Sequence, residues 1–194
     1  MQINNRSSKL VKLVVLSLLT TVSLVLFFIS FPLPLLPPYL KVDFSDVPAL
    51  IAGLIFSPLA GIVVVFLKNA LYFVATGATD PIGVVANFIA GTLYVFPVAY
   101  LYKKYKGVKS IVAGLAIGTV GMAVIMSVLN YFIVLPAYSL LVGMEMNDTI
   151  KLTSVVAGVL PFNFIKGVIV SLLFVPLFIK LREWIESKHA SMMN

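Results

Sequence analysis

Two lysines lie inside long apolar stretches of the sequence, where a charge is costly. Lys68 is in the middle of residues 59–76, and Lys166 lies well inside residues 155–179. A charged side chain within a membrane span usually faces the interior of the helix bundle or a water-filled cavity. Lys166 also lies too deep for its ammonium group to reach the membrane surface easily. We therefore expect Lys166 to have a buried functional or structural partner, whereas a structural pairing would serve Lys68 equally well.

Amide and carboxylate side chains occur at a similar depth to Lys166. Asn163 lies three residues before Lys166, so the two share one helix face. Asn130 is near the outer end of the preceding apolar stretch, and Asp80 and Asn87 bracket the outer end of the one before that. Amides can also join helices through structural hydrogen bonds. Several of them at one depth, together with a lysine, favour a pocket that opens to the outside.

The chemistry of these side chains limits what such a pocket could hold. They offer amide donors and acceptors, one positive charge and aromatic walls, which suit a flat, uncharged heteroaromatic ligand with hydroxyl groups. The chain has no cysteine and one histidine. It also lacks the phosphate-binding loop Gly-x-x-x-x-Gly-Lys-Ser/Thr and the motifs His-Glu-x-x-His and Gly-x-Ser-x-Gly. We expect neither an enzyme nor a metal site, and no cofactor.

The rest of the sequence is that of an all-α membrane protein. Hydrophobic residues make up 61% of the 194-residue chain, charged residues only 11%, and the mean hydropathy is +1.10. A soluble chain of this length could not bury so much apolar surface, so lipid must surround it. With about 20 residues per span, the chain has room for one membrane domain. The predicted spans are residues 10–30, 47–56, 58–76, 81–102, 110–135 and 155–179.

The number of spans depends on whether residues 47–76 form one kinked helix or two helices separated at Ser57–Pro58. Charge distinguishes these possibilities, because positive residues gather on the cytoplasmic side of membrane proteins. With six spans and both termini cytoplasmic, the inner segments hold Arg6, Lys9, Lys12, Lys103, Lys104, Lys106, Lys109, Lys180, Arg182 and Lys188. The outer segments then hold five of the seven acids: Asp43, Asp46, Asp80, Glu145 and Asp148. We therefore predict a six-helix bundle in the lipid bilayer, with basic clusters just beyond the cytoplasmic ends of the spans that do not form a nucleic-acid-binding face.

Residues 31–46 connect the first two predicted helices and are unusual for a loop. Four prolines occur within residues 31–38, and proline removes a backbone donor and interrupts helices. The segment is nevertheless apolar, whereas ordinary loops are polar. Such a loop should lie against the outer face of the protein or cover something.

Taken together, these residues resemble the riboflavin-specific S components of energy-coupling factor (ECF) transporters, and the resemblance covers nearly the whole chain. The residues that carry it are Phe31-Pro-Leu-Pro-Leu-Leu-Pro-Pro-Tyr-Leu-Lys-Val-Asp-Phe-Ser-Asp46, Pro58-Leu-Ala-Gly61, Lys68-Asn69, Gly77-Ala-Thr-Asp-Pro-Ile-Gly83 with Asn87, Asn130-Tyr131, and Pro161-Phe-Asn-Phe-Ile-Lys-Gly167. The loop and the last motif are typical of the riboflavin branch, while six spans are common to S components generally.

The resemblance implies a subunit that captures riboflavin from outside a prokaryotic cell. It implies residence in the cell membrane and association with a transmembrane coupling subunit and two ATPase subunits. Asn130, Asn163 and Lys166 would hydrogen-bond the flavin ring or the ribityl chain, and Tyr39 and Leu40 would close the pocket. The expected substrate-binding residues are Tyr39, Leu40, Lys68, Asp80, Asn87, Asn130, Asn163 and Lys166.

Two alternatives remain open from the residues alone. The chain could be an S component for a different vitamin, because the polar side chains indicate a small-molecule pocket but do not identify its ligand. It could also be a small membrane enzyme or a channel that works without partners. The missing catalytic motifs argue against the enzyme, and the apolar inner halves of the spans argue against a continuous pore.

Overall fold

Helices account for almost all of the computed structural model, which describes residues 2–143 and 146–193. Glu145, one of the predicted outer acids, lies outside the described residues. Two short antiparallel strands, β1 (Phe31–Pro32) and β2 (Lys41–Val42), close the loop after the first helix. The helices are α1 (Gln2–Phe28), α2 (Asp46–Ile55), α3 (Pro58–Ala75), α4 (Pro81–Tyr105), α5 (Gly107–Leu129), α6 (Leu135–Val142), α7 (Asp148–Ser154) and α8 (Leu160–Met193). Two π-helical turns, η1 (Asn130–Val134) and η2 (Val155–Val159), join α5 to α6 and α7 to α8.

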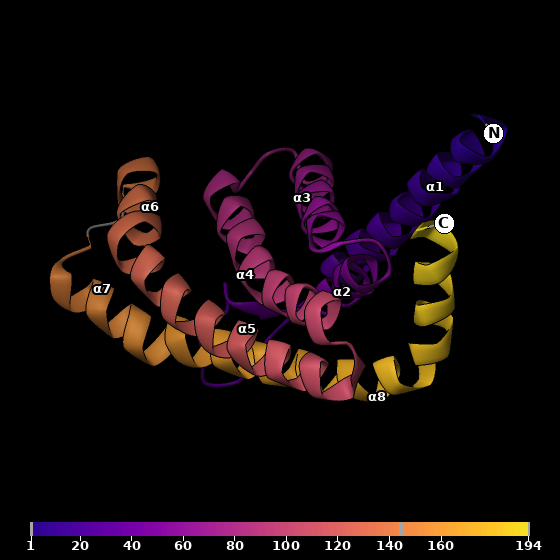
Figure 1. Ribbon diagram of the computed structural model, residues 1–194. Helices are drawn as coiled ribbons and strands as arrows, with labels where there is room; N and C mark the ends of the chain where they lie inside the picture. Colours follow the sequence, from indigo (N-terminus) through magenta and orange to yellow (C-terminus); the bar gives the residue numbers. More distant parts are fainter. Residues whose placement is uncertain (1, 144–145, 194) are drawn as a thin grey trace.

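Five of the described helical stretches are long and apolar enough to cross a membrane. They are Lys9–Phe28, Pro58–Ala75, Pro81–Tyr105, Gly107–Leu141 and Asp148–Ser187. The sixth, α2, is apolar but has only ten residues. The beginning of α1 and the end of α8 lie at one end of the molecule, and α6 and α7 lie at the other (Figure 1). The predicted six hydrophobic helices, with a short second one, are therefore present in the described chain.

The break between α2 and α3 has a local cause. The Ser57 hydroxyl accepts a hydrogen bond of 3.2 Å from the backbone N–H of Ala60 and so caps α3. Pro58 follows at the first helical position, where its missing N–H costs nothing. The chain therefore starts a new helix here rather than continuing a kinked one.

The last two spans are longer than expected from the sequence. Residues 136–154 were expected to form a connection, but only residues 143–147 separate α6 from α7. Pro136 does not end the fifth span, because the chain widens into η1 just before it and the N–H of Leu135 bonds to the carbonyl of Asn130. At the other end, the Asn147 side chain accepts a 2.8 Å hydrogen bond from the N–H of Ile150 and starts α7 early.

The short helix α2 lies at the centre of the packing. Every residue of α2 except Ile51 is buried. A Cβ atom placed on Gly53 would lie 2.9 Å from the Ala99 Cβ, and one placed on Gly61 would lie 2.9 Å from the carbonyl oxygen of Ala49. These glycines let α2 approach α3 and α4 closely. Neighbouring helices therefore enclose α2, which need not span a bilayer alone.

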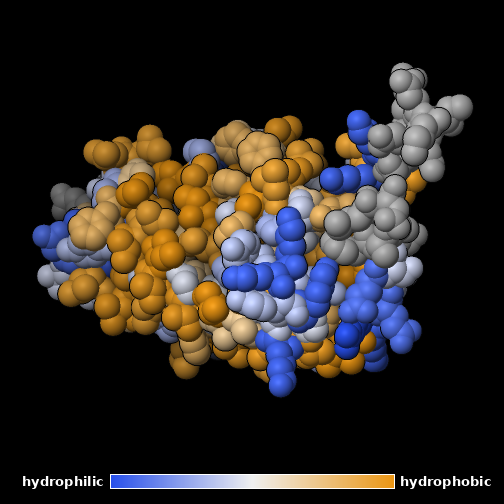
Figure 2. Space-filling model, viewed as in Figure 1, coloured by the Kyte–Doolittle hydropathy of each residue, from blue (hydrophilic) through white to orange (hydrophobic). Residues whose placement is uncertain are grey.

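The outer faces of the other helices are apolar. Leu13, Val120 and Leu172 are more than half exposed, as are many other large apolar side chains. Figure 2 shows hydrophobic residues over most of the visible surface, with hydrophilic residues gathered near the α4–α5 junction and the end of α8. Such a surface is suited to lipid along its length and to water at its ends.

Candidate functional site

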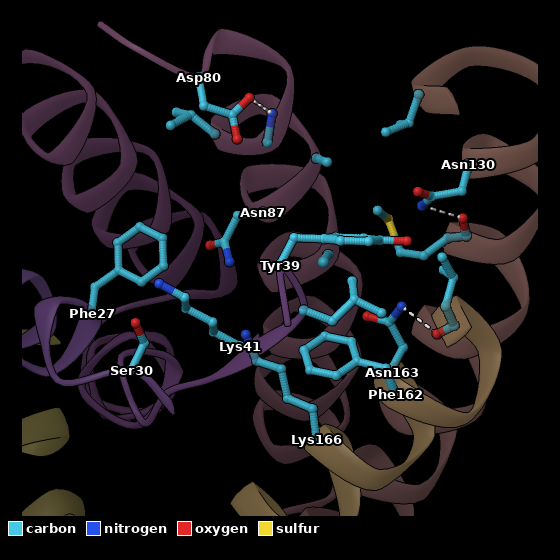
Figure 3. Close-up of a pocket in the computed structure, with 18 of the residues that line it drawn as sticks. Phe27, Ser30, Tyr39, Lys41, Asp80, Asn87, Asn130, Phe162, Asn163 and Lys166 are labelled. Atoms are coloured by element: carbon cyan, nitrogen blue, oxygen red, sulfur yellow. Dashed lines mark hydrogen bonds between the residues drawn. The ribbon is translucent and has the colours of Figure 1, made fainter. Parts of the chain in front are cut away.

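A cavity of about 400 Å³ lies between α1, α3, α4, α5–η1–α6 and η2–α8, and the loop after α1 contributes to its wall (Figure 3). Sites for small molecules commonly have volumes of about 300–1,000 Å³. The polar residues that line it are Ser30, Tyr39, Lys41, Tyr72, Thr76, Thr79, Asp80, Asn87, Asn130, Tyr138, Asn163 and Lys166. The cavity is thus large enough for a small organic molecule and has hydrogen-bonding groups on several sides.

Seven of the eight residues expected from the sequence line this cavity, and Lys68 does not. The seven are Tyr39, Leu40, Asp80, Asn87, Asn130, Asn163 and Lys166. The sequence reasoning did not select Phe27, Lys41, Tyr138 and Phe162, which also line it. Lys41 follows Leu40 and Phe162 precedes Asn163, so their positions beside predicted site residues could have identified them. Tyr138 was in a segment expected to be a connection, and Phe27 carried no signal of its own.

Two asparagines of the cavity wall use their amide nitrogens for backbone hydrogen bonds and leave their amide oxygens free. The Asn130 Nδ2 donates a 2.8 Å hydrogen bond to the carbonyl of Met126, and the Asn163 Nδ2 donates a 2.9 Å bond to the carbonyl of Val159. Both side chains are buried, and Figure 3 shows both bonds. Neither Oδ1 accepts a hydrogen bond from a described residue. Both oxygens are therefore available as acceptors for a ligand.

Asn87 provides a third acceptor. Asn87 lines the cavity, and its buried Oδ1 has no hydrogen-bond partner among the described residues. An unpaired buried polar group costs about 1–3 kcal/mol. A ligand that donates a hydrogen bond to this oxygen would recover that cost. Asparagine side chains from α4, η1 and α8 thus line one cavity, and their amide oxygens could accept hydrogen bonds from one ligand.

The two π turns form part of the same wall. Asn130 and Val134 are the first and last residues of η1, and both line the cavity, as does Val159 at the end of η2. The turns η1 and η2 contact each other. A π turn widens the helix locally, and such turns are common at functional sites. Here the widening occurs where the chain borders the cavity.

Lys166 belongs to a buried cluster of charges below the cavity. Its Nζ lies 2.9 Å from Asp43 Oδ2 and 3.9 Å from Asp46 Oδ2. The Lys68 Nζ lies 2.7 Å from Asp46 Oδ1 and also donates to the Ser45 hydroxyl, which in turn donates to Asp43. Two lysines are therefore balanced by two aspartates. The single positive charge expected from the sequence is neutralised, because both acids are buried rather than exposed on the outer side.

The position of Asp43 in this cluster affects its ionisation. Burial raises the pKa of the Asp43 carboxyl group, but the ammonium groups of Lys166 and Lys68 outweigh burial and lower that pKa to about 2. The Asp43 carboxylate consequently remains charged at neutral pH. Lys166 keeps a permanent anionic partner and presents only its remaining N–H donors to the cavity.

The loop that covers the cavity is tied down at both of its sides. Phe31 pairs with Val42 in the two-stranded sheet, and Asp43 directly after it holds Lys166. At its far side, the ring of Pro37 packs against η2, where a Cβ on Gly158 would lie 3.3 Å from Pro37 Cγ. The proline-rich loop therefore covers the cavity, as an apolar loop was expected to cover something.

The mouth of the cavity is bridged by a tyrosine and an acid. The Tyr138 hydroxyl lies 2.8 and 2.9 Å from the two carboxylate oxygens of Asp80. Asp80 also caps α4, since its Oδ1 accepts a 2.8 Å hydrogen bond from the N–H of Gly83. The Asp80 carboxylate thus already accepts hydrogen bonds from protein groups, and it joins α6 to the start of α4 at the cavity edge.

No group of three or more His, Cys, Asp or Glu residues in the described chain is arranged to hold a metal ion. The polar residues of the cavity are amides, hydroxyls and lysines, apart from Asp80 at its mouth. These side chains suit a neutral organic ligand better than a cation.

Comparison with known proteins gives a consistent result. The sequence model of the family described as "ECF transporter, substrate-specific component" matches residues 11–178. The riboflavin transporter FmnP of Bacillus subtilis is 49% identical over 186 residues, which cover 94% of this chain and 98% of that protein. The riboflavin transporter RibU of Staphylococcus aureus is 40% identical over 177 residues, covering 90% and 92%. A solved structure of the S component of a bacterial ECF transporter is 40% identical, with a TM-score of 0.77 and coverage of 91% and 98%.

Proposed function

The chain belongs to the family of substrate-specific components of ECF transporters, and we propose that its cavity binds riboflavin as the transported substrate. The observation that carries the proposal is the cavity itself, a volume of about 400 Å³ lined by three asparagine side chains whose amide oxygens accept no hydrogen bond from a described residue. Two relatives that are 40–49% identical over nine-tenths of this chain are riboflavin transporters. The fold is that of an S component, as expected.

The chemistry of riboflavin matches these groups. The ribityl hydroxyls and the imide N–H of the flavin ring are donors, and the oxygens of Asn87, Asn130 and Asn163 are acceptors. The ring carbonyls are acceptors, and Lys166 has N–H groups left after its bond to Asp43. Phe162 contributes an aromatic wall. Asp43 and Asp46 neutralise Lys166 and Lys68, so these two lysines add no net charge that would demand an anionic ligand.

A fluorescence titration tests this proposal directly. Riboflavin added to the detergent-purified chain should lose fluorescence on binding, with saturation at one ligand per chain and sub-micromolar affinity. A panel of other water-soluble vitamins in excess should not displace it. Absence of quenching at micromolar riboflavin would remove the proposal, and displacement by another vitamin would support the alternative of an S component with a different substrate. The enzyme alternative is removed by the family, whose members are transporter components.

We further infer that the chain works in the cell membrane of a prokaryote with a transmembrane coupling subunit and two ATPase subunits. The chain carries no phosphate-binding loop, so the energy for transport must come from other subunits. The relatives named above are bacterial. Riboflavin accumulation in vesicles that contain this chain alone would contradict the inference.

The proposed orientation places both termini in the cytoplasm and the mouth of the cavity outside. Because the chain has no cysteine, single cysteines can report sidedness. In intact cells, a membrane-impermeant maleimide should label Thr149→Cys, in the exposed first turn of α7, and should not label Lys103→Cys, at the exposed end of α4. Both should be labelled after the membrane is opened. The reverse pattern in intact cells would show the opposite orientation.

A further inference from the structure

A groove of about 550 Å³ lies where α4 passes into α5, at the opposite end of these helices from the cavity. Its polar part is formed by Tyr105, Lys106 and Lys109, and its apolar part by side chains further along the two helices. Figure 2 shows hydrophilic residues gathered in this region, beside the hydrophobic surface of α5. The groove thus combines positive charge with an apolar surface, and the site for the transported substrate does not include it.

The two lysines of the groove lack anionic partners. Neither Lys106 nor Lys109 forms an ion pair with a described residue. Glu186 attracts the Lys106 ammonium electrostatically, but the Glu186 carboxylate is already paired with Arg182 at 2.9 Å. The Lys106 ammonium lies 4.7 Å from the centre of the Tyr102 ring, and burial lowers its pKa, with Glu186 partly opposing the change. A partly desolvated cation without a paired anion gains free energy when an anion approaches it.

The apolar part of the groove lies further along the two helices than its lysines. Leu101 on α4 and Ala113 and Ile117 on α5 form it, and Ile117 is 55% exposed. From Gly107 to Ile117 the helix advances about 15 Å at 1.5 Å per residue. That is half of the roughly 30 Å hydrocarbon core of a bilayer. The whole groove, from its polar end to Ile117, therefore extends about as far along α5 as one leaflet is deep.

We propose that this groove binds one anionic phospholipid, with its phosphate between Lys106 and Lys109 and an acyl chain along Leu101, Ala113 and Ile117. Charge complementarity selects an anionic headgroup, since each basic residue near the surface contributes about 1 kcal/mol of attraction to anionic lipid. The apolar part of the groove, its apolar arm, favours a lipid over a soluble phosphate. The proposal is independent of which vitamin occupies the cavity.

The neighbouring lysines provide a matched control. Lys103 and Lys104 belong to the same basic segment and are exposed, but they do not line the groove. The double variants Lys106→Gln/Lys109→Gln and Lys103→Gln/Lys104→Gln remove the same number of charges from the same region. A specific site predicts that only the first pair matters. Diffuse attraction between a basic surface and lipid predicts equal effects.

Native mass spectrometry of the full-length chain in detergent can count bound phosphatidylglycerol. We expect one tightly bound phosphatidylglycerol, about tenfold weaker binding in Lys106→Gln/Lys109→Gln and less than a twofold change in Lys103→Gln/Lys104→Gln. Ala113→Phe, which fills the apolar arm without changing charge, should also weaken binding severalfold. Phosphatidylcholine at equal concentration should not replace the bound lipid. Riboflavin titration of each variant confirms folding, because the groove and the cavity share no residue.

Three results would overturn the proposal. Equal losses in the two double variants would show unspecific attraction to a basic surface. Displacement of the lipid by soluble glycerol phosphate would show an anion site without a lipid chain. Unchanged binding in Ala113→Phe would exclude the apolar arm. A failure of riboflavin binding with normal lipid binding would contradict only the proposed function.

Discussion

Replacing Lys166 by methionine is expected to weaken riboflavin binding by about 10- to 100-fold and to destabilise the fold. Methionine has a similar length and no charge, so the cavity keeps its shape but loses donors to the ligand, worth about 1.5–3 kcal/mol for a charged group. Asp43, which is completely buried, would lose the ammonium group at 2.9 Å. Breaking one side of a buried ion pair costs about 3–5 kcal/mol. Fluorescence titration measures the first effect and thermal unfolding the second.

A second variant separates these two effects. In Lys166→Met/Asp43→Leu both charges are removed, and the remaining pair of Lys68 and Asp46 at 2.7 Å stays balanced. Apolar replacement of a whole buried ion pair is often neutral or stabilising, but the Ser45 N–H and hydroxyl also lose their acceptor. Thermal stability should therefore recover in part while riboflavin binding stays weak. Lys103→Met, on the exposed end of α4, serves as the control and should change neither. Equal affinities in Lys166→Met and Lys103→Met would remove Lys166 from the binding site.

Replacing Asn163 by leucine should weaken riboflavin binding by about 10- to 100-fold with a modest effect on stability. Leucine nearly matches asparagine in shape but removes the acceptor oxygen that faces the cavity, so a donor of the bound ligand would be left unpaired at a cost of about 1–3 kcal/mol. The carbonyl of Val159 loses one donor as well, but it can keep its helical bond. Titration of the purified variant measures the loss.

Asn69 offers an unusually close control for this variant. It is buried to a similar degree, at 2% exposure against 5% for Asn163, and its Nδ2 also donates to a carbonyl four residues earlier, that of Val65 at 2.8 Å. It does not line the cavity. Asn69→Leu should therefore leave riboflavin affinity unchanged. A similar loss in both variants would mean that helix packing, rather than contact with the ligand, explains the effect of Asn163→Leu.

Much of the site could be predicted because depth along a membrane helix follows from position in the sequence. Asn130, Asn163 and Lys166 had to lie at similar levels once the spans and their directions were set. The same reasoning could not find the partners of the lysines. Asp43 and Asp46 are more than twenty residues from Lys68 and 120 from Lys166, and the path of an irregular loop does not follow from periodicity. The sequence therefore assigns them only to an outer segment, whereas the structure buries both between the helices.

Among the helices, too, features set by neighbouring residues were predictable, whereas others were not. The break before α3 was predictable, since Ser57 and Pro58 act on adjacent backbone. The extension of the fifth span through Pro136 was not, because it requires the π turn η1, and no simple sequence pattern marks such a turn. Tyr138 was missed at the mouth for this reason, although its bond to Asp80 joins α6 to α4.

The buried charge cluster also has a consequence for how the chain is made. Lys68 and Asp46 are carried by the adjacent helices α3 and α2, so the two can enter the membrane together as one neutral hairpin. Asp43 must wait for Lys166, which is on α8 and is synthesised last. Until then the nascent protein holds an unmatched acid near or within lipid, a costly state. Arrival of α8 therefore completes the neutralisation of this cluster, because it brings the ammonium group that pairs with Asp43.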